Sequence, residues 1–242
     1  MFIKSKKIDH TALNALVNSG LNRHLAKFYS ARGIKHIDDA TLLIEKIIPP
    51  EALTNNTLMA SILADAILQK HKILIIGDYD TDGATSTAVG VRALKMMGAE
   101  VDYLVPNRFE FGYGLTPEIV DLAKEKNPKI IITVDNGIAS VEGVNQANQY
   151  GIDVLVTDHH LPGETLPHAK CIVNPNQHGC SFPSKYLCGV GVIFYVMNAL
   201  RAELLLTFRH LLLVSAAVSL LGLAAAIAMP NQLLRGREHN AR

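Results

Sequence analysis

A short apolar run that ends in carboxylates constrains this chain more than any other feature. The run Ile73 to Ile76 has the continuous apolar character of a strand buried on both faces of a parallel sheet. Three carboxylates follow it at alternate positions: Asp78, Asp80 and Asp82. Carboxylates this close repel one another unless a cation neutralises them, and hard divalent cations prefer oxygen ligands. The stretch therefore predicts a buried strand that ends at a divalent-metal site.

The same spacing matches the opening of an EF-hand calcium loop, Asp-x-Asp-x-Asp-Gly. That loop requires a bidentate Glu at its twelfth position, where this chain has Val89, and it follows a helix rather than a buried strand. The EF-hand interpretation therefore fails. On this stretch alone, the acids could still serve only to solvate the end of the strand.

Composition places few limits on function. The chain has 242 residues, enough for one large domain or two small ones. Its 23 basic and 22 acidic residues give a net charge of +1, so any affinity for nucleic acid must come from a local groove. Three unevenly spaced cysteines fit neither a disulfide framework nor a zinc site, and the N-terminal residues are not typical of a secretory signal. We expect a cytoplasmic monomer.

Strands and helices alternate through the middle of the chain. Residues 11–48 and 57–70 have helical periodicity and form a helical lead-in. Strands are expected at 73–76, 100–106, 129–134, 153–156 and 171–173, and helices at 84–97, 117–126, 139–150 and 190–203. This alternation predicts an α/β fold with a parallel sheet and right-handed crossovers. The expected division is a lead-in over 1–70, an α/β domain over 71–203 and an apolar tail over 204–242.

Metal-binding side chains follow three of the expected strands. Besides the acidic run, Asp135 follows the strand at 129–134, and Asp158, His159 and His160 follow the strand at 153–156. Ligands bind beyond the carboxyl ends of parallel strands, so these groups should meet at one edge. The donor set suits Mn²⁺ or Mg²⁺, and imidazole favours Mn²⁺. The side chains of His159 and His160 are expected to leave on opposite sides, one towards metal and one towards substrate.

Other motifs carry less information. Arg108 follows the strand at 100–106, where it could hold a phosphate oxygen, although an exposed surface position is an equal alternative. No P-loop is present and no G-x-G-x-x-G follows a strand, so nucleotide-hydrolase and dinucleotide-binding interpretations lack support. Ser86 lies near the acidic run without a G-x-S-x-G motif.

At these residues the sequence resembles the DHH phosphoesterase family, which is named for the run found here as Asp158-His159-His160. Residues 77–83 look like the first motif of that family, and residues 135–137 look like the second. The stretches 106–114 and 174–183 resemble the bacterial single-stranded-DNA exonucleases of the family more than its small pyrophosphatases or nanoRNases. The resemblance covers residues from about 20 to 203.

The resemblance implies a parallel-sheet domain with helices on both faces and a two-metal phosphodiesterase that releases nucleotides from the 5′ end of single-stranded DNA. The implied cofactors are Mn²⁺ or Mg²⁺, held by Asp80, Asp82, Asp135 and His159. The implied catalytic residues are His160, Asp158 and Asp78, and the expected substrate-binding residues are Arg108, Asn107 and Ser86. A single-stranded-DNA-binding protein and a RecQ-type helicase are the further implied partners.

The chain departs from the family after Glu203. Family members of this type carry a fourth motif, a Gly-Thr-Val-Ala-Asp-like run whose Asp completes the second metal site, and no such run follows here. Instead, residues 211–228 are apolar and uncharged, which meets the minimum length for a membrane span. A buried helix and the out-of-frame tail of a truncated gene are the alternatives, and we favour truncation.

On that hypothesis this chain has weak or no nuclease activity. Two other functions stay open: a phosphatase that acts on short oligonucleotides or pyrophosphate, and an inactive metal-binding scaffold.

Overall fold

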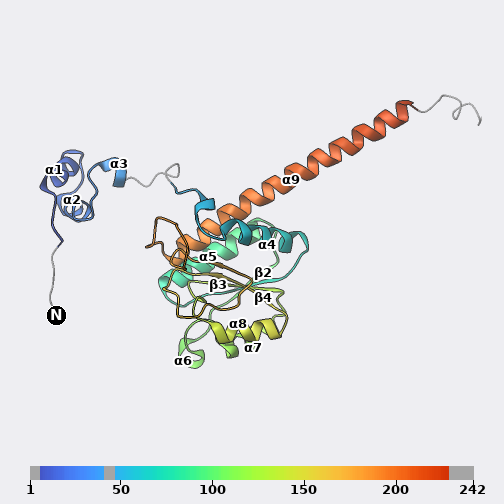
Figure 1. Cartoon of the computed structure of the whole chain (residues 1–242), viewed down its shortest axis with the longest axis horizontal. Helices are drawn as coiled ribbons and strands as arrows, with labels where there is room; N and C mark the ends of the chain where they lie inside the picture. The colour runs from blue at the N-terminus through green and yellow to red at the C-terminus, as the bar shows by residue number, and fades with distance from the viewer. Residues whose placement is uncertain (1–5, 41–46, 229–242) are drawn as a thin grey trace, which may run out of the picture. The chain divides into compact units, whose positions relative to one another are not determined.

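Five parallel strands form the sheet of this protein, in the order β2-β1-β3-β4-β5 (Figure 1). The strands are β1 (Ile73–Ile76), β2 (Val101–Leu104), β3 (Ile130–Val134), β4 (Asp153–Thr157) and β5 (Cys171–Val173). The computed structural model describes residues 6–40 and 47–228, without the side chains of Arg108 and of residues 222–228. The predicted parallel α/β fold is confirmed.

Helices cover both faces of the sheet (Figure 1). One face carries α7 (Pro117–Glu125) and α8 (Val141–Gln149), and the other carries α4 (Asn56–Leu68), α5 (Thr81–Met96) and the first part of α9 (Gly189–Ala228). Alternate side chains of β1 divide between these layers, since Leu74 packs with Ile119 of α7 while Ile75 faces Gly90 of α5. Burial on both faces explains why β1 and β3 have no polar alternation.

The strand order creates a switch point between β1 and β3. The helix after β1, α5, covers one face, whereas the helix after β3, α8, covers the other (Figure 1). The two connections therefore diverge beyond the carboxyl ends of these strands and leave a crevice, which is where ligands bind in open α/β sheets. The acidic run follows β1, and Asp135 follows β3.

Residues 1–48 form a separate N-terminal unit. It contains α1 (His10–Asn18), α2 (Arg23–Ser30) and α3 (Ile37–Ala40), and the buried residues of its small core come from α1 and α2. The glycines that punctuate the expected helical stretch, Gly20 and Gly33, have positive φ angles of 94° and 84° after α1 and α2. Residues 41–46 of that stretch lie outside the described residues.

Several boundaries differ from the sequence-based expectation. The second unit begins at residue 49, ahead of a short 3₁₀ helix, η2 (Pro50–Ala52), because α4 packs against α9 and so stays with the sheet. Helix α5 begins at Thr81, because Asp80 caps it. A short helix that we did not predict, α6 (Arg108–Phe111), follows Asn107.

Helix α9 continues without a break past residue 203 to Ala228. Leu200 and Leu204 are buried against the domain, but every residue over 211–221 is exposed. The buried-helix interpretation of that stretch is therefore wrong for the residues whose side chains are described. The segment Gly189–Leu221 is long and apolar enough to cross a membrane.

Candidate metal centre

The acidic run is positioned by the first turn of α5. The Oδ1 atom of Asp80 accepts a hydrogen bond of 2.9 Å from the backbone N–H of Gly83 and so caps the helix. Asp78 lies nearer the strand, and its Oδ1 accepts the N–H of Tyr79 at 2.8 Å. The run is thus a helix entry rather than a free loop, and each carboxylate has a defined direction.

Asp82 reaches from α5 to the start of α9. Its Oδ2 accepts the N–H of Gly189 at 2.7 Å, and its Oδ1 accepts the N–H of Val190 at 2.8 Å. A carboxylate is a favourable partner for these N–H groups because they carry the positive end of the helix dipole. Asp82 therefore ties the first turn of α5 to a helix that begins 107 residues later.

Asp135 is the most strained and least satisfied acid of the site. Its backbone has a φ of 61°, which is uncommon for a residue other than glycine, and its side chain is only 2% exposed. Its Oδ1 accepts no hydrogen bond of good geometry among the described residues, although Nε2 of His159 lies 3.0 Å from it. Burial, followed by the nearby charges of Asp82 and Asp80, raises the pKa of Asp135 to about 7.

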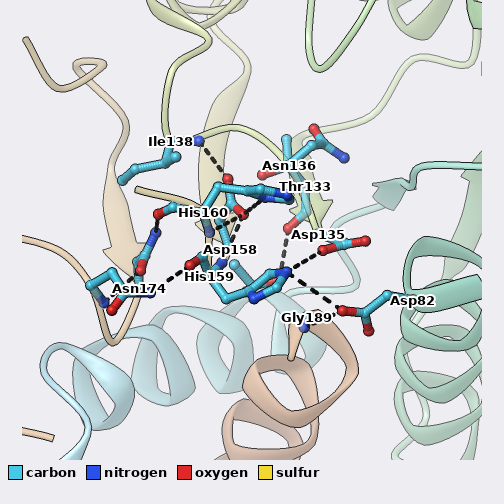
Figure 2. A network of polar contacts seen from close by, with 12 residues as sticks. Asp82, Thr133, Asp135, Asn136, Ile138, Asp158, His159, His160, Asn174 and Gly189 are labelled. Atoms are coloured by element: carbon cyan, nitrogen blue, oxygen red, sulfur yellow. Dashed lines mark hydrogen bonds and ion pairs between the residues drawn. The ribbon is translucent and has the colours of Figure 1, made fainter. Parts of the chain in front are cut away.

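The start of α9 closes one side of this acid. A Cβ atom at Gly189 would lie 2.6 Å from Oδ1 of Asp135, so only glycine allows the helix to approach this closely. Figure 2 shows Gly189 beside Asp82 and Asp135.

Both histidines after β4 lie at the centre (Figure 2). Nε2 of His159 is 3.0 Å from Oδ1 of Asp135 and 3.5 Å from Oδ2 of Asp82. The rings of His159 and His160 are 4.6 Å apart between centroids, at a tilt of 52°. The expectation that they leave on opposite sides is wrong, because β4 ends at Thr157 and the alternation of a strand no longer applies.

Asp158 has its hydrogen bonds supplied by the protein. It is 1% exposed. Its Oδ1 lies 2.7 Å from Nδ1 of His160 and accepts the N–H groups of His159 and His160, and its Oδ2 accepts the N–H of Ile138 at 2.9 Å. Burial by itself would raise the pKa of Asp158, but the hydrogen bonds from His160 and Ile138 lower it. The same contact with Asp158 raises the pKa of His160.

Three asparagines support the centre, and sequence reasoning gave them no role. Nδ2 of Asn176 donates to the carbonyl of His159 at 2.6 Å, and Nδ2 of Asn174 donates to the carbonyl of His160 at 2.9 Å. Nδ2 of Asn136 donates to the carbonyls of Ile76 and Val134, which joins the ends of β1 and β3. The position of Asn174-Pro175-Asn176 directly after β5 was the available signal.

The expected substrate-binding residues do not lie together at the metal centre as the acids and histidines do. Ser86 is fully buried in α5, and its Oγ has no partner among the described residues, so this position does not support contact with substrate. Asn107 is exposed, and its Oδ1 accepts the N–H of Phe109 at the start of α6. The side chain of Arg108 lies outside the described part of the chain.

The residues present fit a divalent cation. One ligand atom each from Asp135, His159 and His160 lie within 4.8 Å of one another, and Asp82 adjoins them through His159. A buried carboxylate oxygen without a hydrogen bond is costly unless a cation completes its surroundings. Carboxylate and imidazole donors together suit Mn²⁺, and the carboxylates suit Mg²⁺.

Comparison with known proteins identifies a family and similar exonucleases. Residues 72–221 match the family model "DHH family, N-terminal domain". A single-stranded-DNA-specific exonuclease RecJ of Dickeya dadantii (strain 3937) is 51% identical over 181 residues, which cover 74% of this chain and 31% of that protein. The chain thus spans about a third of the length of that curated relative.

Two crystal structures of RecJ proteins are similar to this chain. An exonuclease RecJ bound to manganese has 35% sequence identity and a TM-score of 0.60, over 65% of this chain and 40% of that one. RecJ from Thermus thermophilus in complex with Mn²⁺ has 29% identity and a TM-score of 0.62, over 81% of this chain and 27% of that one.

Proposed function

Because this chain belongs to the DHH family, we propose that it is a metal-dependent hydrolase that cleaves the phosphodiester bonds of single-stranded DNA. The observation that carries the proposal is the meeting of Asp82, Asp135 and His159 at the switch point, where the buried Oδ1 of Asp135 lies 3.0 Å from the His159 imidazole but accepts no hydrogen bond of good geometry. The similar proteins named above are single-stranded-DNA-specific exonucleases, and two were crystallised with manganese.

Asp135 and His159 would hold the cation, with Asp80 and Asp82 completing the acidic side. Bound Mn²⁺ or Mg²⁺ supplies the positive charge that stabilises a phosphoryl-transfer transition state and lowers the pKa of water. Asp82 is held by two backbone N–H groups, so its carboxylate keeps its direction when the site loads. Asp78 would act electrostatically, because its charge contributes to the raised pKa of His160.

His160 would act on the substrate. Its Nδ1 is fixed against Asp158, which leaves Nε2 for other partners; the hydroxyl of Tyr113 lies 3.5 Å from that atom. The raised pKa keeps the ring protonated to higher pH, so Nε2 can donate a hydrogen bond to a phosphate oxygen or a proton to the leaving oxygen. Asp158 therefore orients the ring and holds its charge.

The finer features follow the family resemblance. We propose that nucleotides leave from the 5′ end, that Arg108 and Asn107 bind phosphate oxygens, and that the reaction takes place in the cytoplasm. A single-stranded-DNA-binding protein and a RecQ-type helicase stay predictions as partners.

The test uses the full chain with Mn²⁺, 5′-labelled single-stranded DNA and the small diester bis(4-nitrophenyl) phosphate. We expect slow turnover, since no acidic residue between Glu203 and Glu238 replaces the fourth-motif Asp. Asp135→Asn should abolish that turnover. Asp153→Asn is the matched control, because Asp153 pairs with Lys170 at the opposite end of β4.

Equal turnover by the Asp135→Asn variant and the wild type would refute the proposal. Hydrolysis of dinucleotides or pyrophosphate, but not of longer DNA, would favour the phosphatase alternative. Manganese binding without hydrolysis of any phosphoester would favour the scaffold alternative.

A further inference from the structure

A pocket of about 580 Å³ lies beside the candidate metal centre, on the side of α7 and α8. It is lined by the loop after β3, the first turns of α7 and α8, and the stretch from Tyr113 to Leu115. It shares Asp158 and His160 with the centre. Its volume falls within the range of pockets that bind small ligands, about 300 to 1,000 Å³.

The walls of this pocket offer apolar and aromatic surface. Leu115 and Ile138 are almost fully buried behind it, whereas Tyr113 and Leu161 are 53% and 80% exposed. Exposed aromatic side chains beside a nucleic-acid site are the surfaces on which single-stranded bases stack. A flat ring that entered here would cover apolar surface that water now contacts.

The charges argue against a second phosphate in this pocket. Glu118 and Glu142 lie in the first turns of α7 and α8 and line it, together with Asp158. No Lys or Arg is among the lining residues of the described part of the chain. The charge of Asp158 is offset by its contact with His160, so Glu118 and Glu142 are the carboxylates that would repel a phosphate. The pocket therefore suits an uncharged group that can form hydrogen bonds.

His160 connects the pocket to the centre. Its ring lines the pocket, while one of its nitrogens lies within 4.8 Å of ligand atoms of Asp135 and His159. A nucleotide whose phosphate sits at the centre can therefore place its own base in the pocket. We propose that this pocket binds the base of the nucleotide next to the scissile phosphate, with Tyr113 as its stacking surface. The proposal rests on the proposed function.

The test measures binding of 5′-phosphorylated single-stranded DNA of about 12 nucleotides by fluorescence anisotropy. Ca²⁺ replaces Mn²⁺, and a gel after each titration checks that the DNA is intact. One nucleotide at a time is made abasic. At one position near the scissile bond we expect a loss of affinity of about 5- to 150-fold, the effect of one stacked base. The other positions should change little.

The variants assign that loss to Tyr113. In Tyr113→Ala the intact and abasic oligonucleotides should bind equally weakly, whereas Tyr113→Phe should keep the wild-type difference. Phe208→Ala is the control, since Phe208 is 55% exposed on α9 and lies outside the pocket lining. Thermal melting followed by circular dichroism confirms that each variant is folded.

Three outcomes would overturn the pocket proposal. The first is that no abasic position changes the DNA affinity, and the second is that the protein binds no DNA. The third is that Tyr113→Ala lowers the affinity but keeps the difference between intact and abasic oligonucleotides. Manganese binding by the same preparations, followed by electron paramagnetic resonance, tests the metal centre independently. If the protein does not bind manganese, the proposed function is contradicted. If it binds manganese but binds DNA with the same affinity whether or not a base is missing, only the pocket proposal is contradicted.

Discussion

Two aspartates at the ends of neighbouring strands are almost equally buried, and yet their pKa values shift in opposite directions. Asp135 after β3 and Asp158 after β4 are 2% and 1% exposed. Oδ1 of Asp135 accepts no hydrogen bond from the described residues, and the pKa of Asp135 rises to about 7. Asp158 accepts hydrogen bonds from His160 and Ile138, and its pKa is lowered.

The difference shows that burial alone does not decide whether an acid is ionised. The protein itself supplies the partners of Asp158, which can therefore remain charged as a fixed part of the scaffold. Asp135 has only the imidazole of His159 close to its Oδ1 and stands among other carboxylates, so in the proposed site a cation would complete its surroundings. Asp158 therefore holds the site in shape, whereas Asp135 is the acid whose charge a cation would neutralise.

The largest expected effect is on the stability of the metal-free protein. The raised pKa of Asp135 means that folding is favoured below the unfolded pKa of about 3.9, and that this advantage is lost as pH rises through about 7. Asp135→Asn removes the buried charge. Above pH 7 it should raise the free energy of unfolding by up to about 4 kcal/mol, measured by urea denaturation in EDTA. The gain should vanish near pH 4, and an equal gain at both pH values would contradict the assignment.

The same substitution should weaken metal binding. Replacing a carboxylate ligand by an amide removes its charge, so Mn²⁺ affinity should fall more than about 100-fold, or about 2.7 kcal/mol. Titration calorimetry at pH 8 measures the loss. In the wild type, affinity should rise as pH increases towards 7, because the Asp135 carboxyl must first lose its proton. Asp153→Asn should match the wild type throughout.

Asp158→Asn should change stability in the opposite direction. The side-chain NH₂ of the new Asn would face backbone N–H groups, such as those of Ile138 and His160, that now donate to the Asp158 carboxylate. The free energy of unfolding should therefore fall by about 1 to 3 kcal/mol at pH 7. The pKa of His160 should return towards its ordinary value, which NMR titration of the ring would show. A stabilising effect like that of Asp135→Asn would erase the distinction between the two acids.

The smallest effect is expected at the loop after β5. Asn176→Ala removes the donor to the carbonyl of His159 and should lower the free energy of unfolding by about 0.5 to 1.5 kcal/mol. Chemical denaturation measures it. Asn198→Ala, which removes an exposed hydrogen bond within α9, is the control and should cost less. Equal costs would mean that the Asn176 contact does not brace the histidine.

The sequence predicts the meeting of Asp135 and His159 because both follow buried apolar runs, and parallel strands bring their carboxyl ends to one edge. Their contact of 3.0 Å agrees with that expectation. The sheet and most of its helices are predictable for the same reason, since strand and helix periodicities are local properties of the chain.

Features that depend on distant contacts were not predictable. Nothing local to Asp82 indicates that it caps a helix beginning at Gly189. The burial of Ser86 follows from the packing of α5, and the shared direction of the two histidine rings follows from a strand that ends at Thr157. We expected the family resemblance to end at residue 203, but α9 continues past that point and the family model matches through residue 221.

In the proposed site, the two hydrogen bonds that Asp82 accepts from the start of α9 would couple metal binding to the position of that helix. One carboxylate receives the first N–H groups of that helix and also faces the imidazole of His159. By thermodynamic reciprocity, whatever loosens the start of α9 weakens the hold on the cation by the same free energy, and a bound cation fastens the helix in return. For the proposed enzyme, this means that a partner bound to the exposed part of α9 would change the metal affinity at the start of that helix.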